Sequence, residues 1–278
     1  MARFRLLAID IDGTLVNSRH ELTEATRCAV LRAKTAGIEI VLATGRRYSR
    51  VLPLVEPLEL NVPLVTASGA LVKRAADHST LYRAEFVPSA LERCLQGIAD
   101  RGYEAVLYDD TYDQGFDYYV VNPVSPQAEL AEFLERNAGF ERVWSDLMTR
   151  PPGGVFSCFA MGTREQMLHL RHELEREQPG LLSMHVLRSP RYRGFMCEIA
   201  PAGVSKWVAV NRLATEWGID SEEICAVGDD VNDVPMIVAA GLGVAMGNAL
   251  DEVKAAADRI APTHDEDGLV QVVEWLLE

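Results

Sequence analysis

Residues 4–15 decide the fold: Phe4-Arg-Leu-Leu-Ala-Ile-Asp10-Ile-Asp12-Gly-Thr-Leu15. The apolar first half is typical of a buried parallel strand, and Asp10 falls just beyond its end. Ligands of an open parallel sheet bind beyond the carboxyl ends of its strands. Because residues i and i+2 of an extended chain project to the same side, Asp10 and Asp12 can face one site, and Gly13 then allows a sharp turn. The stretch therefore predicts an acidic site at the end of the first strand.

The paired carboxylates point to a bound cation. Two carboxylates this close repel each other unless a cation or a shared proton lies between them. Mg²⁺ is the natural choice, because it takes hard oxygen ligands and usually keeps waters plus a substrate phosphate. We therefore predict Mg²⁺ as the cofactor.

Two other interpretations of this loop are open. In a calcium loop, Asp10, Asp12 and Glu21 would fill the first, third and twelfth positions. That pattern is broken because Leu15 stands at the required glycine, Thr14 replaces the third acid, and a strand precedes the loop instead of a helix. The remaining interpretation is an acidic turn without a ligand. The segments described next favour the magnesium site over both.

Three further segments place polar groups at the ends of predicted elements. The stretch Val227-Gly-Asp-Asp-Val-Asn-Asp233 follows a second apolar strand, and Asp229 comes close to Asp10 if both strands are central in one sheet. Thr44-Gly45-Arg46 ends another strand and offers a hydroxyl and a backbone N–H to phosphate oxygens. Lys206 lies in the first turn of a helix, whose N-terminus also favours anions. Together these segments supply carboxylates, a hydroxyl group, a backbone amide and an ammonium group, which are the groups that phosphoryl transfer uses.

Strand and helix signals alternate in both outer thirds of the chain, which predicts an α/β fold with a parallel sheet covered on both faces. The expected strands are residues 4–9, 38–43, 62–67, 224–227, 242–245 and 259–261. A helix should begin after the cap Thr23 and stop at Gly37. Further helices are expected at residues 205–217, 234–240, 251–258 and 267–277.

The middle of the chain has a different pattern. It is richer in aromatic residues, with amphipathic helices near 88–101 and 164–178. Short strands are expected at 103–108, 117–121, 154–161, 182–187 and 194–199. Neighbouring strands with turn signals between them suggest an antiparallel sheet with helices on one face. We therefore expect a core domain of residues 1–84 and 200–278, interrupted by an α+β domain of residues 85–199.

Composition narrows the class of protein. The 278 residues carry a formal charge of −14, which disfavours nucleic acid and anionic membranes as partners. Five cysteines, an odd number without a Cys-x-x-Cys pair, fit reduced thiols in the cytoplasm. The longest apolar stretch, residues 237–246, is far too short to span a bilayer, and no secretory apolar region precedes Asp10. We expect a soluble cytoplasmic protein whose oligomeric state the sequence does not indicate.

The four sites resemble, in order, the four motifs of the haloacid dehalogenase superfamily. More narrowly, the chain is similar to Cof-type phosphatases with a type IIB cap, an insert between the second and third motifs. That narrower resemblance rests on residues 198–206, 243–249 and 265–268, which read Glu-Ile-Ala-Pro-Ala-Gly-Val-Ser-Lys, Gly-Val-Ala-Met-Gly-Asn-Ala and Asp-Glu-Asp-Gly. It implies a Rossmann-like parallel-sheet core domain with an inserted α+β cap domain that selects the substrate.

The resemblance also implies roles for the site residues. Asp10 would be the nucleophile, forming an aspartyl-phosphate, and Asp12 would protonate the leaving oxygen and then activate water. Mg²⁺ would be held by Asp10, the Asp12 carbonyl and Asp229. The phosphate oxygens would be held by Ile11 through its amide, Thr44, Gly45, Lys206 and Asn232. Asp233 would orient Lys206 or a metal-bound water.

Other residues are candidates for substrate selection. Arg46 is one, and Arg191 and Arg193, in the turn before Phe195, could reach a second anionic group. A solvent-exposed basic turn is the alternative for the last two. The chain also departs from its subfamily at Ser68, where asparagine is usual, and at His264 and Trp207. These departures would either alter the rim of the substrate site or only the packing.

The sequence thus predicts a Mg²⁺-dependent hydrolase of a small phosphorylated metabolite, with a sugar phosphate as the expected substrate. A phosphomutase of the same superfamily is an alternative, disfavoured because those enzymes usually carry their cap soon after the first motif. A metabolite-binding protein without turnover is another. The intact set of Asp10, Asp12, Lys206 and Asp229 argues against it.

Overall fold

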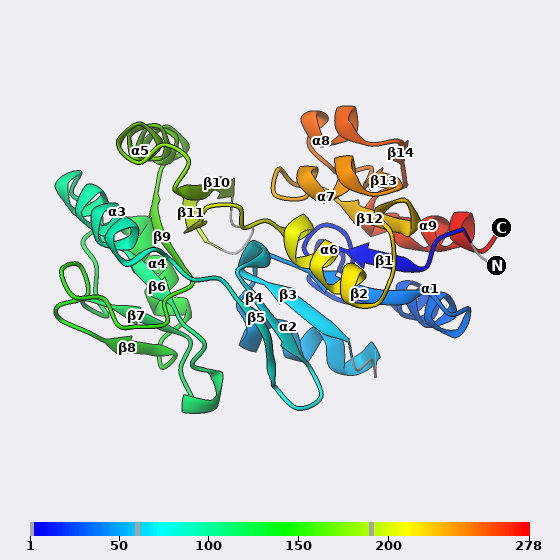
Figure 1. Ribbon diagram of the computed structural model, residues 1–278, viewed down its shortest axis with the longest axis horizontal. Helices are drawn as coiled ribbons and strands as arrows, with labels where there is room; N and C mark the ends of the chain where they lie inside the picture. The colour runs from blue at the N-terminus through cyan, green and yellow to red at the C-terminus, as the bar shows by residue number, and fades with distance from the viewer. Residues whose placement is uncertain (1–2, 59–61, 189–191) are drawn as a thin grey trace. The chain divides into compact units, whose positions relative to one another are not determined.

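The computed structural model describes residues 3–58, 62–188 and 192–278. The chain divides into two compact units, one formed by Met1–Tyr82 and Ser205–Glu278 and the other by Arg83–Val204. Each unit is built around a sheet of its own (Figure 1).

The sheet of the first unit has eight strands in the described part of the chain, in the order β14-β13-β12-β1-β2-β3-β4-β5. Their bounds are β1 Leu6–Ile9, β2 Glu39–Ala43, β3 Pro63–Thr66, β4 Leu71–Arg74, β5 Thr80–Arg83, β12 Ile224–Gly228, β13 Leu242–Ala245 and β14 Arg259–Ile260. Pairing is parallel from β14 to β3, which confirms the predicted α/β class. The antiparallel strand β4, which with β5 extends this edge, was not predicted.

The central strands are buried on both faces. Leu6 and Ala8 pack in one apolar cluster with α6 and α7, while the alternate residues Leu7 and Ile9 are equally buried. Side chains of a strand alternate between faces, so the sheet is covered on both sides, as predicted. The helices of this unit are α1 Glu24–Thr35, α2 Tyr48–Val55, α6 Lys206–Glu216, α7 Val234–Ala239, α8 Asp251–Ala256 and α9 Gly268–Leu277.

Local signals explain where α1 and α6 begin and end. Thr23 caps α1, because its side chain accepts a hydrogen bond from the backbone N–H of Thr26, at 3.1 Å. Just beyond the helix, Gly37 has a φ of 88°, the left-handed conformation that glycine adopts without strain. Ser205 caps α6 in the same way by accepting from Val208 N. Lys206 is therefore fixed in the first turn of its helix.

The strand ends bring four segments together. In the parallel register, Ile9 of β1 lies opposite Val227 of β12 on one side and Leu42 of β2 on the other. Ala43 of β2 in turn lies opposite Val65 of β3. The residues that follow these strands therefore meet at one edge of the sheet, where parallel-sheet proteins bind ligands.

The second unit has a six-stranded sheet in the order β10-β11-β9-β6-β7-β8. The strands are β6 Val106–Tyr108, β7 Tyr118–Val120, β8 Glu141–Val143, β9 Ser157–Gly162, β10 Leu182–Arg188 and β11 Phe195–Pro201, and the helices are α3 Pro88–Asp100, α4 Ala128–Arg136 and α5 Arg164–Glu177. Pairing is antiparallel except between β7 and β8.

Helices cover both faces of this second sheet, so the expectation of helices on one face is wrong. Cys158 and Ala160 of β9 lie in one apolar cluster with α3 and α5. Phe159, between them, points the other way and contacts Phe133 of the unpredicted helix α4, with ring centroids 5.1 Å apart.

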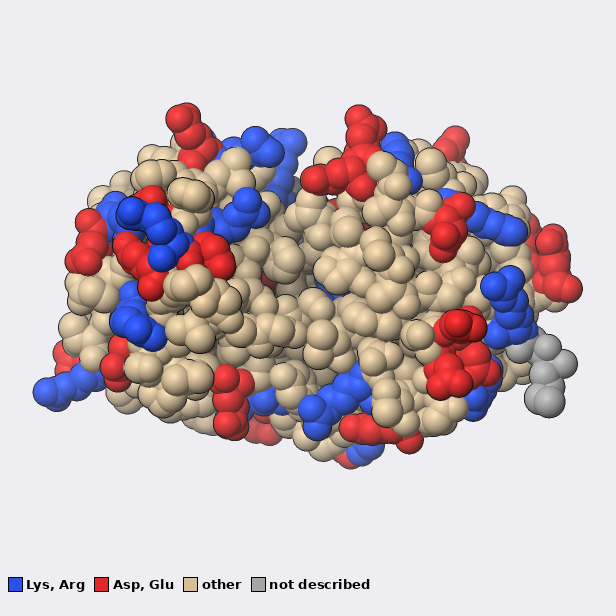
Figure 2. Space-filling model, turned by 45° about the horizontal axis from the view of Figure 1, so that its top comes forward, with Lys and Arg blue, Asp and Glu red and all other residues tan. Residues whose placement is uncertain are grey.

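The lengths of the helices and the charges on the surface concern possible contacts with membranes and other partners. Among the described residues, no helix combines the length and the apolar character that a membrane crossing needs. On the face shown in Figure 2, acidic and basic side chains are interspersed.

Candidate active site

The two acidic turns meet at the carboxyl edge of the first sheet. Asp10 directly follows β1, and Asp229 directly follows the neighbouring strand β12. One carboxylate oxygen from each of Asp10, Asp229 and Asp233 lies within 4.8 Å of the other two. The structure therefore gathers three acids from segments more than two hundred residues apart in sequence.

Lys206 ties two of these acids together. Its Nζ donates to Asp10 Oδ1 and to Asp233 Oδ1, both at 2.6 Å, and its side chain is 2% exposed. The other oxygen of Asp233 accepts from the backbone N–H groups of Asp229 and Asp230, at 3.0 and 3.1 Å. Asp233 thus fixes both the ammonium group and the backbone of the loop that carries Asp229.

Burial and crowding set the charges of this cluster. Burial, and then the repulsion from Asp233, raise the pKa of Asp10 well above its ordinary value, although Lys206 opposes the shift. Burial, and then repulsion from Asp10 and Asp233, raise the pKa of Asp229 to about 9. Burial disfavours the charged form of Lys206, but Asp10 and Asp233 outweigh it and raise the pKa of the ammonium group. The cluster has more acid than one lysine balances, so a divalent cation would relieve it.

The donor set fits a hard cation. Mg²⁺ binds carboxylate oxygens, usually one or two in number, together with water and phosphate oxygens. Asp10 and Asp229 supply such oxygens at neighbouring strand ends, while both oxygens of Asp233 are engaged in the contacts just described. The geometry therefore suits Asp10 and Asp229 as ligands and Asp233 as the group that orients them.

Asn248 supports Asp229, a role that the sequence did not predict. Asn248 Nδ2 donates to Asp229 Oδ2 at 3.3 Å and to the carbonyl oxygen of Gly13 at 2.9 Å. Its Oδ1 accepts from the backbone N–H of His264, at 2.9 Å. Asn248 thereby holds both acidic loops to the turn at His264–Glu266, which precedes α9. Its place shortly after β13 could have indicated this role, because the ends of the parallel strands meet at the site.

A second group of polar residues lies around Gly45. Asn232 Nδ2 donates to Ser68 Oγ at 3.1 Å, and Asn232 Oδ1 is buried without a partner. A β-carbon built on Gly45 would lie 3.4 Å from Ser68 Oγ and 3.7 Å from Asn232 Nδ2. Thr44 is buried, and its Oγ1 accepts from the backbone N–H of Arg46, at 3.1 Å. The structure thus brings Thr44, Gly45 and Asn232 to one place and adds Ser68.

The backbone at Ser68 is strained. Ala67 and Ser68 have φ values of 46° and 52°, which side-chain-bearing residues rarely adopt. The conformation is held because Ala67 N donates to Arg46 O and Ser68 N donates to Thr44 O, each at 3.0 Å. Next to them, a β-carbon on Gly69 would lie 2.2 Å from the carbonyl oxygen of Ser205. This turn therefore joins the loop after β2 to the start of α6.

The remaining predicted residues lie in different environments. Ile11 is fully buried in the loop after β1, where its carbonyl oxygen accepts from Leu15 N at 3.0 Å. Asp12 is paired with Arg46, whose Nε lies 2.6 Å from Asp12 Oδ2. Arg193 is exposed in the second unit, and its backbone N–H donates to Glu132 Oε2 at 3.0 Å. Arg191 lies outside the described residues.

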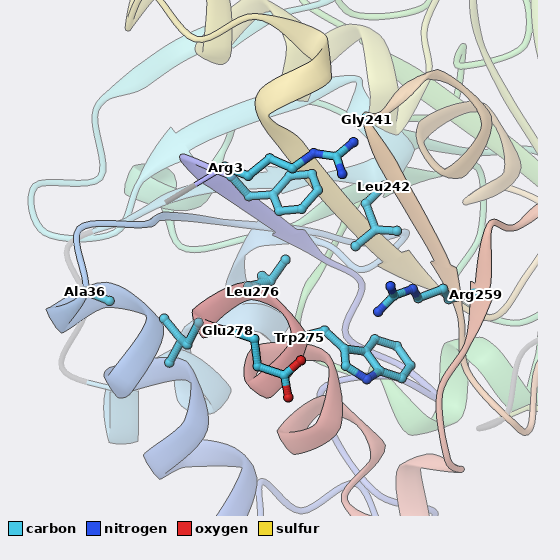
Figure 3. A pocket seen from close by; sticks show the side chains of 10 residues that line it. Arg3, Ala36, Gly241, Leu242, Arg259, Trp275, Leu276 and Glu278 are labelled. Carbon is cyan, nitrogen blue, oxygen red and sulfur yellow. The ribbon is translucent and has the colours of Figure 1, made fainter. Parts of the chain in front are cut away.

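A separate cavity of about 640 Å³ lies elsewhere in the first unit. Figure 3 shows Arg3, Arg259, Trp275 and Glu278 around it, and the Arg259 guanidinium carbon lies 5.0 Å from the centre of the Trp275 ring. Its lining includes Phe4 and Gly241, which precede β1 and β13, so it opens at the amino ends of the strands. None of Asp10, Asp229 and Asp233 lines this cavity, so it is not the candidate active site.

Comparisons with known proteins show which proteins the chain resembles. The sequence model of the family described as haloacid dehalogenase-like hydrolase matches residues 7–273. Phosphatase YwpJ of Bacillus subtilis strain 168 is 30% identical, over 98% of this chain and 100% of its own length. The 5-amino-6-(5-phospho-D-ribitylamino)uracil phosphatase YwtE of the same organism is 28% identical, over 98% of each chain. A crystal structure of a haloacid dehalogenase-like hydrolase from Bacteroides thetaiotaomicron superimposes with a TM-score of 0.78 at 29% identity, over 98% of this chain and 99% of that one.

Proposed function

This chain belongs to the haloacid dehalogenase-like hydrolases and is a phosphatase of that family, and on that premise we propose that it is Mg²⁺-dependent and hydrolyses phosphomonoesters of small metabolites. The observation that carries the proposal is the buried cluster of Asp10, Lys206, Asp229 and Asp233 at one strand edge. It combines a nucleophile, a fixed positive charge and cation ligands, the parts that phosphoryl transfer requires.

Asp10 is the nucleophile of the proposed reaction. Its Oδ1 accepts a hydrogen bond from Lys206, so we assign Oδ2 as the attacking atom. Its bond to phosphorus forms as the bond from phosphorus to the ester oxygen breaks, and Asp12 gives that oxygen a proton. Water then attacks the aspartyl-phosphate, Asp12 takes a proton from the water, and phosphate leaves with Asp10 restored.

Mg²⁺ would be held by Asp10, the carbonyl oxygen of Asp12 and Asp229. When bound, it would screen the repulsion between the Asp10 carboxylate and the phosphate dianion. Thr44, Gly45, Lys206, Asn232 and the amide of Ile11 would hold the phosphate oxygens. The buried Asn232 Oδ1, which has no partner within the protein, supports a hydrated site here, because such an acceptor needs a donor that a bound water supplies.

The substrate class we propose is a sugar or sugar-alcohol phosphate. Three of the Bacillus subtilis relatives, YwtE, YitU and YcsE, are named 5-amino-6-(5-phospho-D-ribitylamino)uracil phosphatases, and that compound carries its phosphate on a ribityl chain. The cytoplasm is the proposed location, supported by five free cysteines. The inserted second unit would select the substrate, with Arg193 and Arg191 among the candidates.

Phosphate release from p-nitrophenyl phosphate and from a panel of sugar phosphates tests the proposal. We expect release in Mg²⁺, loss of release in EDTA, and loss in Asp10→Asn. Asp220→Asn should behave as wild type, because Asp220 is exposed and precedes β12, whereas Asp229 follows that strand. Glucose 1-phosphate that isomerises without release would indicate a phosphomutase instead. Binding of phosphate esters without release or isomerisation in Mg²⁺ would contradict both enzymes and favour a binding protein.

A further inference from the structure

Each aspartate of the first acidic loop pairs with a different basic side chain. Asp10 accepts from Lys206, whereas Asp12 accepts from Arg46, which follows β2. The Arg46 guanidinium grips both oxygens of Asp12: Nε donates to Oδ2 at 2.6 Å, and Nη2 donates to Oδ1. Such a fork fixes the plane of a carboxylate as well as its position.

Arg46 is itself held in place. Its side chain is 9% exposed, although the Asp12 side chain that it grips is 30% exposed. Its backbone N–H donates to Thr44 Oγ1 at 3.1 Å, and its carbonyl oxygen accepts from Ala67 N at 3.0 Å. The donor is therefore more buried than its acceptor and its backbone is anchored, which makes the arginine suited to set where the carboxylate lies.

We infer that Arg46 is a positioning residue for Asp12, not a residue that contacts the substrate. The inference rests on the proposed function, in which Asp12 serves first as acid and then as base at the same oxygen position. A partly exposed carboxylate on a loop can adopt several rotamers, and the proposed proton transfers require one that reaches the reacting oxygen. A misplacement of about 1 Å can slow a reaction about 100-fold.

The side chain of His20 also lies near Asp12. Its Nδ1 lies 3.6 Å from Asp12 Oδ1, the oxygen that Arg46 Nη2 also contacts. This contact to Oδ1 is longer than either of the hydrogen bonds that Arg46 donates to the two oxygens. The fork, and not charge alone, is therefore the feature that the inference depends on.

The inference predicts a dependence on the leaving group. Expulsion of a sugar alkoxide needs a proton from Asp12, whereas p-nitrophenolate leaves without one. Both esters still need Asp12 to activate water in the second half of the reaction. Arg46→Ala should therefore lose activity toward the alkyl ester from the first turnover, but with p-nitrophenyl phosphate it should release one equivalent of phenolate quickly and then stall.

The experiment compares wild type, Arg46→Ala, Arg46→Lys, Asp12→Asn and the double variant Arg46→Ala/Asp12→Asn, all as the full chain in Mg²⁺. Arg27→Ala is the matched control, because it removes the same charge from helix α1, where Arg27 pairs with Glu24. We expect kcat on a sugar phosphate to fall about 100-fold in Arg46→Ala. The phenolate burst should remain near one equivalent, and KM and inhibition by inorganic phosphate should change less than about threefold.

Arg46→Lys keeps the charge but not the fork, so it should recover only a small part of the loss. The double variant should be no slower than Asp12→Asn, because both changes remove one function. A rise in KM with unchanged kcat, or additive losses in the double variant, would overturn the inference and make Arg46 a substrate contact. Thermal melting of each variant separates these results from unfolding.

A crystallographic comparison keeps the inference separate from the proposed function. Structures of wild type and Arg46→Ala report the position of the Asp12 carboxylate whether or not the protein turns over any ester. We expect the carboxylate to shift by about 1 Å or more, or to occupy several rotamers, in Arg46→Ala. An unmoved carboxylate overturns the inference, while absence of phosphate release by wild type overturns the proposed function alone.

Discussion

The carboxylate of Asp229 lies directly against the backbone of Gly13. A β-carbon on Gly13 would stand 2.1 Å from Asp229 Oδ2 and 2.6 Å from its carboxyl carbon. Gly13 also has a φ of 77°, in the left-handed region. The glycine of the first acidic loop therefore serves two purposes: it turns the chain after Asp12, and it leaves the space that the acid of the neighbouring strand occupies.

Replacement of Gly13 by alanine should displace Asp229 and weaken the metal site. We expect the affinity for Mg²⁺ to fall about 100-fold, as when groups that orient metal ligands are removed. Isothermal titration with Mg²⁺ measures the change. Gly37→Ala is the matched control, because Gly37 has a φ of 88° but no atom within 4 Å of the new β-carbon. It should lose about 1 kcal/mol of stability and no metal affinity. Equal Mg²⁺ affinities for the two variants would contradict the close contact.

Metal binding should strengthen as the pH rises. The pKa of Asp229 is raised to about 9 from an ordinary value of 3.8, mainly by burial. Between these two values the folded chain without metal holds a proton that the unfolded chain has released, so this group's contribution to stability falls as the pH rises. Mg²⁺ must displace that proton. The rise in melting temperature caused by Mg²⁺ should therefore be larger at pH 9 than at pH 6. Titrations in buffers of different ionisation enthalpy should detect proton release, and a Mg²⁺ affinity independent of pH would refute the prediction.

Loss of the buried lysine should destabilise the protein when no metal is bound. Lys206→Met leaves Asp10 and Asp233 without their shared ammonium group, which we expect to cost about 3 kcal/mol in EDTA. The double variant Lys206→Met/Asp233→Asn should recover part of this loss, because Asn keeps an oxygen for the backbone N–H groups of Asp229 and Asp230. Urea unfolding measures both. Neither variant should turn over substrate, and a Lys206→Met protein as stable as wild type would exclude the repulsion that we describe.

Two substitutions at Ser68 separate its hydroxyl from its strained backbone. Ser68→Ala and Ser68→Gly both remove the acceptor of Asn232 Nδ2, but only glycine adopts a φ of 52° without strain. Ser68→Gly should therefore be more stable than Ser68→Ala by about 1 kcal/mol. Both should raise KM for a phosphate ester by a similar factor, about 10-fold for one lost hydrogen bond in the site. Different KM values for the two variants would mean that the backbone, and not the hydroxyl, carries the effect.

Much of the first unit could be predicted because its signals are local. The apolar runs before Asp10 and Asp229 mark buried strands, and the rule that ligands bind at strand ends brings the two acids together. The hairpin of β4 and β5 was missed because Lys73 interrupts the apolar pattern of β4. Lys73 is nevertheless 2% exposed, and its Nζ contacts Thr80 Oγ1 at 3.1 Å. Its long aliphatic stem is buried with it, which composition alone does not reveal.

In the second unit, α4 carried a signal that was overlooked. Leu130, Phe133 and Leu134 have the spacing of one buried helical face, and all three are buried. The pairing of Arg46 with Asp12 is a different case. Both residues lie in loops beyond strand ends, where the direction of a side chain depends on turns such as the one at Ser68. Strand periodicity does not extend into such turns, so this contact required the structure.

The position of β1 between β2 and β12 has a consequence for how the protein is made. Ribosomes produce the chain from its amino end, so Asp10 emerges long before Asp229 and Lys206 do. Until Ile224–Gly228 has been translated, β1 has an open edge, and Asp10 has neither β12 beside it nor Asp229 close to it. A chain that stops before Lys206 therefore lacks the buried cluster on which the proposed function depends.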